Sequence, residues 1–513
     1  MAPISIPQDS NAQGVVDQIE RQFTLSPETL IDLTKAFLNE FELGLGSYGH
    51  PMAMIPTFVT GVPDGTETGT FLALDLGGTN MRVCEVVLNG DKTFNLIQQK
   101  FKVSEALKSG EATALFDYLA DSVHTFLITH ATTKYASPHS VDAGAAPTGD
   151  IVHLGLTFSF PVEQTALGAG KILTWTKGFS ATGAIGNDVV KLLQDAFDRK
   201  SMHVKCVALV NDTVGTLLSR SYIAGGSIVG AIFGTGTNGA YIEEVAKIRK
   251  LANTPIAEKG GYMVVNTEWG AFNNSRSHLP FTSFDNAVDR LSINPGFQAF
   301  EKFISGMYLG EIARQVLGSL VDAVPPILFG GKGTPVLNAH YGLDTSFMSN
   351  IETAWDDNDH HTIPSLDAFD QEQLHPHVRA KLDRIRQVIV EDLAFQSEKV
   401  TLKDAAIVRT ICYIVARRAA TLSGVALATV LVQTDYASLP GQAKSLKNEK
   451  ETINVGVDGS LIEKYPEFEK DLRESLRVVV GEDVEKRVDI GLAKDGSGVG
   501  AALCALQALK QIH

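Results

Sequence analysis

Hydrophobic side chains recur every three or four positions near the start of the chain, which is the spacing of one helix face. The pattern runs from Ala12 to Leu45. It is interrupted only at Ser26-Pro27, a pair that suits the first residues of a new helix. The sequence therefore predicts two consecutive helices after a polar N-terminal segment.

Strand-like patterns come next along the chain. The stretches 70–76, 81–88 and 93–103 are rich in residues that favour strands. Asn89-Gly90 lies between the last two, and this dipeptide is the strongest short-range signal for a hairpin. We expect an antiparallel three-stranded unit here.

From residue 111 onward, helical and strand-like patterns alternate, which indicates an α/β fold. A second β-rich start at 226–244 precedes another series of long helical stretches, so two α/β halves are expected. Helical stretches are predicted at 111–130, 188–199, 213–222, 297–320 and 404–432, strands at 152–158, 204–210, 453–457 and 488–492, and surface loops at 132–150, 354–377 and 433–452.

Length and charge narrow the range of partners. With 513 residues the chain is long enough for two domains, and 44% hydrophobic with 20% charged residues is the composition of a globular protein. The 44 basic and 59 acidic residues give a net charge of −15, which repels phosphate backbones and anionic lipid headgroups. Nucleic acid is therefore not an expected partner.

The cysteines and the N-terminus bear on location. Cys84, Cys206, Cys412 and Cys504 lie far apart in apolar runs, which is typical of buried thiols in a reducing compartment. The N-terminal segment has neither a signal-peptide nor a transit-peptide pattern, so a cytoplasmic location is expected. The apolar stretch 419–434 is too short to span a bilayer and is expected to be a core helix, without membrane insertion.

Five glycine-containing turns follow apolar strands or open helices. Without a side chain, glycine lets backbone N–H groups close on a phosphate oxygen, and Thr or Ser adds a hydroxyl donor. Several such turns in one chain suggest a polyphosphate ligand, although any one of them could simply shape a hairpin. The turns are 75–80, 211–213, 234–239, 458–460 and 495–500.

Two common nucleotide motifs do not fit their context. Residues 234–239 match GxGxxG, but the chain continues as a strand where the dinucleotide fingerprint requires a helix. Residues 496–500 do open a helix, but too few residues follow for a βαβ unit. The stretch 330–334 lacks the Walker A spacing. The interpretation that remains is a phosphate-binding turn between two strands.

Asp75 and Asp212 each end an apolar strand. A carboxylate in such a place is costly unless it meets a metal ion, a proton or a hydrogen-bond donor. Both are therefore candidates for a functional site, with a helix cap as the plainer interpretation of Asp212.

Motifs across residues 72–502 resemble those of the hexokinase family, in particular of its glucokinase-like fungal members. They occur in family order along most of the chain, so the resemblance is extensive. The matching segments are 72–83, 156–161, 175–179, 207–216, 233–240, 265–272, 294–302, 308–311, 455–460 and 495–502.

The resemblance implies the actin-like, ribonuclease H-like sugar-kinase fold, an α/β fold with two lobes around a cleft. The small lobe would comprise 71–217 and the returning C-terminal helix, 491–513. The large lobe would comprise the N-terminal segment 1–70 together with 218–490.

The resemblance also implies ATP-dependent phosphorylation of glucose and related hexoses at the 6-hydroxyl, the first step of glycolysis. Asp212 would be the general base, and Lys177 and Arg82 would be catalytic partners. The hexose would be bound by Ser159, Thr176, Lys177, Asn211, Asp212, Asn238, Glu268 and Glu301.

The cofactors implied are ATP and Mg²⁺, with Asp75 holding the metal ion, mainly through water. The nucleotide would contact two phosphate turns and two loops. Its binding residues would be Asp75, Gly77, Gly78, Thr79, Asn80, Thr235, Thr345, Ser349, Gly459 and Ser460.

Two features depart from the family pattern or suggest another site. Phe297 stands where family members commonly have Gln, beside Glu301. His360, His361, His375 and His377 are close in sequence, but neighbouring acidic residues and prolines favour a solvated loop over a metal site.

Two other functions remain open at this stage. A hexose sensor that acts through a protein partner would bind sugar without turnover, and loss of Asp212, Lys177 or Asp75 would have favoured it. An actin- or chaperone-type ATPase would lack the sugar elements 158–160 and 175–177.

We expect the chain to act as a monomer or a homodimer.

Overall fold

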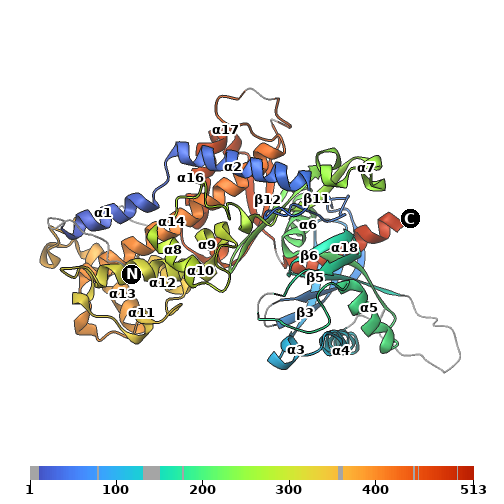
Figure 1. Ribbon diagram of the computed structural model, residues 1–513, viewed down its shortest axis with the longest axis horizontal. Helices are drawn as coiled ribbons and strands as arrows, with labels where there is room; N and C mark the ends of the chain where they lie inside the picture. Colours follow the sequence, from blue (N-terminus) through green and yellow to red (C-terminus); the bar gives the residue numbers. More distant parts are fainter. Residues whose placement is uncertain are drawn as a thin grey trace.

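The computed structural model describes residues 11–77, 80–130, 151–175, 178–355, 362–442, 445–448, 450–493 and 495–512. Two α/β lobes lie side by side along the longest axis, and each is built around its own mixed sheet (Figure 1). The predicted α/β fold with two lobes is confirmed.

The two predicted N-terminal helices are present. Helix α1 (Ala12–Phe23) is capped by the side chain of Asn11, and α2 (Pro27–Gly46) starts at Pro27 with Ser26 as its cap. Ser26 accepts a hydrogen bond from a backbone N–H that the helix would otherwise leave unpaired. Both helices pack on α14 (Leu402–Gln433), so α1 and α2 belong to the large lobe.

The small-lobe sheet has the strand order β4-β3-β2-β5-β8. Its first three strands form the predicted antiparallel unit, whereas β2, β5 and β8 run parallel to one another. Their carboxyl ends therefore lie along one edge. The strands are β2 (Thr68–Leu76), β3 (Asn80–Asn89), β4 (Phe94–Lys102), β5 (Val152–Phe158) and β8 (Val204–Val210).

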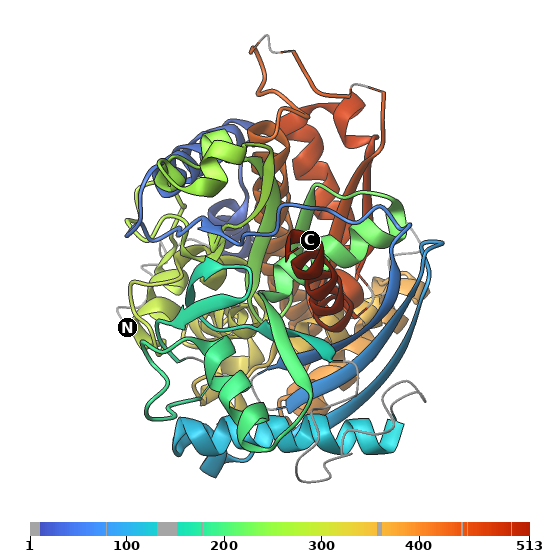
Figure 2. The same ribbon diagram turned by 90° about the vertical axis from the view of Figure 1, so that its right-hand side faces the viewer.

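Helices cover both faces of this sheet. Helices α4 (Ala112–His130) and α5 (Val189–Arg199) pack together over one core, and α18 (Gly496–Ile512) contacts β2, β5 and β8 over another. Figure 2 shows α18, the last helix of the chain, beside strands from near its start. A short helix α3 (Glu105–Ser109) and a hairpin β6 (Val162–Ala166) with β7 (Ala169–Ile172) complete the small lobe.

The large-lobe sheet repeats the same design, with strand order β1-β11-β10-β9-β12-β13. Antiparallel strands occupy one side, and β9, β12 and β13 run parallel. The strands are β1 (Ile55–Pro56), β9 (Val229–Phe233), β10 (Thr237–Glu244), β11 (Tyr262–Asn266), β12 (Ile453–Asp458) and β13 (Val488–Leu492).

Helix α14 is the centre of the large lobe. It is long and apolar enough, by length and composition, to cross a membrane, but 89% of its most apolar stretch is buried inside the protein. It contacts α9 (Ala299–Ile304), α10 (Gly306–Val321), α12 (Thr345–Trp355), α13 (Pro376–Asp392) and α16 (Phe468–Val480). The remaining helices of the large lobe are α7 (Pro255–Lys259), α8 (Ser283–Leu291), α11 (Pro335–Asn338), α15 (Ser460–Lys464) and α17 (Glu482–Glu485).

Helix α6 (Asp212–Ala224) joins the lobes. It packs on α18 of the small lobe and on β9 and β12 of the large lobe. The expected lobe boundary between residues 217 and 218 falls within this helix, so the helix is shared between the lobes.

Candidate active site

Four of the candidate residues lie at the carboxyl edge of the small-lobe sheet. Asp75 is the second-last residue of β2, Ser159 follows β5, and Asn211 and Asp212 follow β8. Because these three strands are parallel neighbours, the fold brings their ends together from three distant parts of the chain. In open α/β sheets such an edge is where ligands bind.

Asp75 is nearly buried and forms an ion pair with Arg82. Arg82 lies opposite Asp75 on β3, and its Nη2 and Nε donate to Oδ2 of Asp75 at 2.8 and 3.2 Å. Burial opposes the charge on Arg82, but the nearby carboxylates of Asp75 and Asp495 raise its pKa. Two of the predicted site residues thus hold each other in place.

Asn211 and Asp212 divide two tasks at the start of α6. The side chain of Asn211 is the helix cap, since its Oδ1 accepts from the backbone N and the hydroxyl of Thr213 at 2.9 and 2.6 Å. Asp212 occupies the first turn, half-buried, and its Oδ1 lies 2.9 Å from the same backbone N. The capping role therefore falls mainly to Asn211, which leaves the second carboxylate oxygen of Asp212 for another partner.

Asp458, at the end of β12 in the large lobe, is a site residue that sequence reasoning missed. Burial raises the pKa of its carboxyl group, repulsion from Asp212 and Glu463 adds to this, and Arg82 acts in the opposite direction. Asp458 of the large lobe therefore lies close enough to Asp212 and Arg82 to interact electrostatically with both. The sequence signal was present, because Asp458 ends an apolar strand just as Asp75 does.

A compact amide and carboxylate network lies on the large-lobe side. Oε1 of Glu268 accepts from Nδ2 of Asn238 at 3.1 Å and from Nδ2 of Asn266 at 2.7 Å. Glu268 has a left-handed backbone conformation, with φ of 57°. A non-glycine residue in this conformation is uncommon and strained, and such residues occur preferentially at functional sites.

Glu301 projects from α9 toward the glycine turn between β9 and β10. Its Oε2 accepts from the backbone N of Thr237 at 3.1 Å. A Cβ on Gly236 would come within 2.7 Å of the same oxygen, so this position requires glycine for the approach of the carboxylate. Phe297, at the start of the same segment, is 66% exposed.

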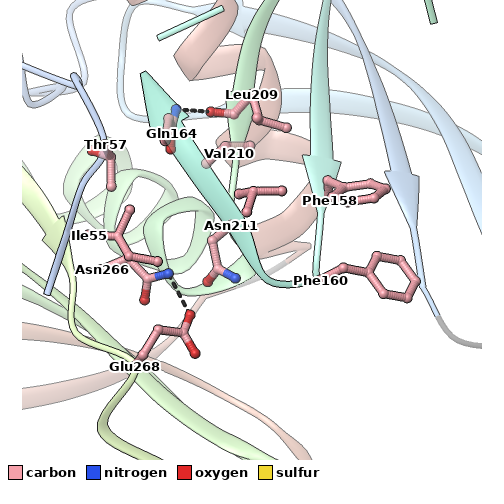
Figure 3. Close-up of a pocket in the computed structure, with 11 residues that line it drawn as sticks. Ile55, Thr57, Phe158, Phe160, Gln164, Leu209, Val210, Asn211, Asn266 and Glu268 are labelled. Atoms are coloured by element: carbon pink, nitrogen blue, oxygen red, sulfur yellow. Dashed lines mark hydrogen bonds between the residues drawn. The ribbon is translucent and has the colours of Figure 1, made fainter. Parts of the chain in front are cut away.

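A pocket between the lobes contains predicted hexose-binding residues from both of them. Its walls include Phe158, Phe160 and Asn211 from the small lobe and Asn266 and Glu268 from the large lobe. In Figure 3 the amide of Asn211 and the carboxylate of Glu268 point toward the same space. Ser159 lies in the chain between the two phenylalanines. Asn238 contacts the pocket through its bonds to Asn266 and Glu268.

The two glycine turns of the large lobe, 234–239 and 458–460, abut one another. A Cβ on Gly234 would come within 3.1 Å of the Cα of Gly459, and Gly306 N donates to Gly234 O at 2.7 Å. This close approach places the start of α10 and the end of β12 beside Thr235.

A larger pocket opens next to these turns, with an empty volume of about 1170 Å³ including its mouth. Its size suits a drug-sized ligand or larger. The hydroxyl of Thr345 donates to Gly306 O and accepts from Gly310 N, so it braces the wall. The wall includes the predicted nucleotide contacts Thr235, Thr345, Ser349 and Ser460, together with Met307, Tyr341, Leu343 and Tyr465.

Several predicted residues lie outside the described part of the chain: Gly78, Thr79, Thr176, Lys177, His360 and His361. Gly77 N donates to Asn80 O at 3.1 Å, which fixes the two ends of the first phosphate turn.

The histidines do not form a metal site in the described part of the chain. His375 caps α13, because its ring accepts a hydrogen bond from His377 N. Within the described residues no group of three or more His, Cys, Asp or Glu side chains is arranged to hold a metal ion.

The four cysteines are buried and free, as expected. Burial raises the pKa of Cys84 and of Cys206 to about 12, so both stay protonated thiols at neutral pH. They take no part in the site chemistry.

The arrangement can support transfer between a polyol and a polyphosphate. Carboxylates and amides line a pocket suited to hydroxyl donors. The half-buried carboxylate of Asp212 follows Asn211 of that pocket and repels the carboxylate of Asp458, which begins the glycine turn 458–460. Known proteins offer an independent comparison. The family described as Hexokinase matches this chain in two segments, residues 15–222 and 228–507.

Individual relatives agree with that match over the full length. The chain is 39% identical to a glucokinase from Aspergillus niger, with 96% of this chain and 97% of the relative covered. It is 38% identical to glucokinase-1 from Saccharomyces cerevisiae, with 96% and 97% covered. A solved hexokinase from Schistosoma mansoni complexed with glucose superposes with a TM-score of 0.77 at 34% identity, covering 96% and 98% of the two chains.

Proposed function

Because this chain belongs to the hexokinase family, we propose that Asp212 accepts the proton of the 6-hydroxyl of a bound hexose while ATP transfers its γ-phosphoryl group. The protein is a kinase that phosphorylates hexoses with ATP, as its hexokinase and glucokinase relatives are named. The observation that carries the assignment is the pocket between the lobes, where Asn211, the neighbour of Asp212 in the chain, lines the same space as Glu268.

The hexose is held by hydrogen bonds from both lobes. Asn211 and Ser159 supply polar groups from the small lobe, and Asn238, Glu268 and Glu301 supply them from the large lobe. A carboxylate accepts hydroxyl protons, and an amide both accepts and donates, so this set suits a ring of sugar hydroxyl groups. Thr176 and Lys177 complete the set by the family resemblance, with the Lys177 ammonium favouring negative charge on the 6-oxygen.

The nucleotide occupies the larger pocket beside the glycine turns. Gly459 and Ser460 with Thr235 lie where the phosphates would pass, and Met307, Tyr341 and Leu343 offer apolar surface to the base. Gly77, Gly78, Thr79, Asn80 and Arg82 would approach the phosphates from the small lobe.

Mg²⁺ fits the carboxylate groups found at this junction. Asp75 and Asp458 offer oxygen ligands only, which magnesium prefers, and burial already disfavours the charge on Asp458 beside Asp212. A bound Mg²⁺ would neutralise charge on the β- and γ-phosphates of ATP. Asp75 would hold the metal ion, and Arg82, which now pairs with Asp75, would offer its guanidinium to a phosphate.

The sensor alternative is not favoured, because relatives over the full length are named as enzymes and the candidate residues Asp75 and Asp212 are present. We further propose that the enzyme acts in the cytoplasm as a monomer or homodimer. The buried free thiols support a reducing compartment.

A coupled assay that detects hexose 6-phosphate tests the activity directly. Glucose, fructose and mannose are each supplied with Mg-ATP, and ATP hydrolysis without sugar is the control. We expect turnover with glucose and at least one other hexose, and little hydrolysis without sugar. Sugar binding without any turnover would instead support a sensor.

A further inference from the structure

Asn266 is a buried residue of the pocket between the lobes, and the proposed function assigns it no task. It is the last residue of β11, and it lines the pocket beside Glu268. Asn266 lies opposite Ala240 on β10, so Asn238, two residues away on that strand, carries its side chain on the same face of the sheet. The strand register therefore brings one buried amide next to two proposed hexose ligands.

The side chain of Asn266 uses both ends of its amide on these two ligands. Its Nδ2 donates to Oε1 of Glu268 at 2.7 Å, as Figure 3 shows. Its Oδ1 accepts from Nδ2 of Asn238 at 2.8 Å. The reverse orientation of the amide would set oxygen against a carboxylate oxygen and nitrogen against nitrogen, so the two neighbours determine which way it points.

The same bonds determine what Asn238 can offer to a sugar. Nδ2 of Asn238 has two hydrogens, and it donates to Oδ1 of Asn266 at 2.8 Å and to Oε1 of Glu268 at 3.1 Å. Both donors of Asn238 are thus used within the protein, and Asn238 can meet a ligand as an acceptor, through Oδ1. A sugar hydroxyl on this side of the pocket therefore meets acceptors for its hydrogen.

The turn after β11 divides its work between main chain and side chains. The hydroxyl of Thr267 donates to Gly239 O at 2.8 Å and accepts from Trp269 N at 3.2 Å, which ties the turn to β10. Glu268 begins the next short helix without using its side chain as a cap. The main chain therefore fixes where Glu268 lies, and the two amides fix one oxygen of its carboxylate.

We propose that Asn266 is a positioning residue for the hexose, which orients the carboxylate of Glu268 and the amide of Asn238 toward the sugar. This role rests on the proposed function, because it acts through two proposed hexose ligands. Loss of Asn266 should weaken sugar binding more than it slows phosphoryl transfer, since the proposed general base Asp212 lies on the strand edge of the other lobe.

Calorimetry of glucose binding tests this role without reference to turnover. Asn266→Ala should raise the Kd for glucose at least about tenfold, the effect expected when a hydrogen bond to a charged group is lost. In the coupled assay the KM for glucose should rise likewise, whereas kcat should stay within a few-fold of the parent and the KM for Mg-ATP should not change. A fall in kcat as large as the rise in KM would reject a role confined to sugar binding.

Asn266→Asp gives a signature that a purely structural role would not produce. The substitution replaces the donor Nδ2 by an oxygen, which repels Oε1 of Glu268 when both carboxyl groups are ionised. Two adjacent carboxyl groups share a proton more readily as pH falls, and this proton restores the missing hydrogen bond. The ratio of variant to parent Kd for glucose should therefore fall at least about threefold from about pH 8 to about pH 5.5.

The comparison with the parent isolates this titration. Among the described residues that line the pocket, Glu268 is the carboxylate beside Asn266, and it is present in both proteins. Glu301 on α9 and Asp212 on α6 are likewise unchanged in the variant. The Kd ratio for Asn266→Ala, which introduces no carboxyl group, should not change with pH. Equal pH profiles for the two variants would reject the restored hydrogen bond and with it the proposal.

Asn273→Asp is the matched control. Asn273 is also buried and also has a left-handed backbone, with φ of 58°. Within the described residues its amide bonds to the hydroxyl groups of Ser275 and Ser277 and to the backbone of 278–279, and not to a proposed hexose ligand. This variant should lower Tm without changing the Kd for glucose. Thermal unfolding of every variant shows that it is folded.

The outcomes separate the positioning role from the proposed function. A glucose Kd for folded Asn266→Ala within about twofold of the parent would reject the role. An equal increase of Kd in Asn273→Asp would also reject it, because the effect would then reflect a general loss of stability. If Asn266→Ala does not fold, the pH profile of Asn266→Asp decides. A parent protein that binds glucose without turnover would argue against the proposed function, and calorimetry would still decide the role of Asn266.

Discussion

At the scale of single residues, the carboxylates at strand ends carry most of the chemistry. Asp75 and Asp212 could be singled out from the sequence because each follows a buried apolar run. Asp458 has the same signature and was missed, since its importance depends on a strand of the other lobe that brings it near Asp212 and Arg82. The hydrogen bond from Asn266 to Glu268 also depends on the left-handed backbone conformation of Glu268, which cannot be predicted from the sequence pattern.

Asp75 is expected to serve the metal-bound nucleotide more than the sugar. Asp75→Ala should raise the KM for Mg-ATP and alter the Mg²⁺ dependence of the rate, because a carboxylate ligand is lost and Arg82 loses its ion-pair partner. Glucose affinity should change little. The rate is measured by Mg²⁺ titration at fixed ATP, with glucose binding followed by calorimetry. An unchanged Mg²⁺ dependence would place the metal ion elsewhere.

Lys250 should show the pH dependence of a buried amine. Its Nζ donates to Gly44 O and Ala53 O at 2.7 Å each, and burial lowers its pKa to about 8. Because the folded pKa lies below the usual value near 10.4, the unfolded chain binds more protons between these limits. The free energy of unfolding contributed by Lys250 should therefore rise as pH increases from about 8 toward about 10.4.

Urea unfolding of the parent and of Lys250→Met at several pH values checks this slope. The variant should be less stable at each pH, because two carbonyl groups lose their donor, and the gap should widen above about pH 8. A gap that is constant from about pH 7 to about pH 10 would mean that Lys250 titrates normally.

At the scale of elements, periodicity predicted most of the helices and strands. Strand β5 and strand β8 fall on their predicted ranges, and Asn89-Gly90 does lie at the turn between β3 and β4. The hairpin of β6 and β7 was not predicted, because its strands are only five and four residues long and too short to show a clear alternating pattern. Helix α13 was missed since its charged, polar face dominates the local composition.

The crossing of α6 and α18 depends on glycine. A Cβ on Gly500 would overlap the Cα of Gly215, so the two helices are in contact along their backbones. Gly500→Ala should push them apart and lower stability by about 1–3 kcal/mol, the usual cost of overpacking. Gly318→Ala is a matched control, since it lies in α10 with nothing near its added Cβ, and should stabilise by about 0.5–1 kcal/mol. Urea midpoints compare the two, and equal effects would show that the crossing tolerates a side chain.

At the scale of the whole molecule, the lobes divide the proposed hexose ligands. Ser159, Asn211 and Asp212 belong to the small-lobe edge, whereas Asn238, Glu268 and Glu301 belong to the large lobe. A hexose can satisfy its hydroxyl groups fully only when both lobes approach it, so glucose alone should close the cleft. Closure would also exclude water from the γ-phosphate.

Small-angle X-ray scattering with and without saturating glucose checks this closure. The radius of gyration should fall when glucose binds, and addition of a sugar that does not bind is the control. A radius unchanged within error, with glucose binding demonstrated by calorimetry, would favour a rigid cleft.

The role of Asp212 is the central claim, and the turnover of its variants tests it most directly. Asp212→Ala and the isosteric Asp212→Asn should each lower kcat by at least roughly a hundredfold, the low end for a lost general base, while the protein stays folded and still binds glucose. Asp198→Asn, an exposed carboxylate of the same lobe, should match the parent. Turnover by both Asp212 variants within a few-fold of the parent would remove Asp212 from the mechanism.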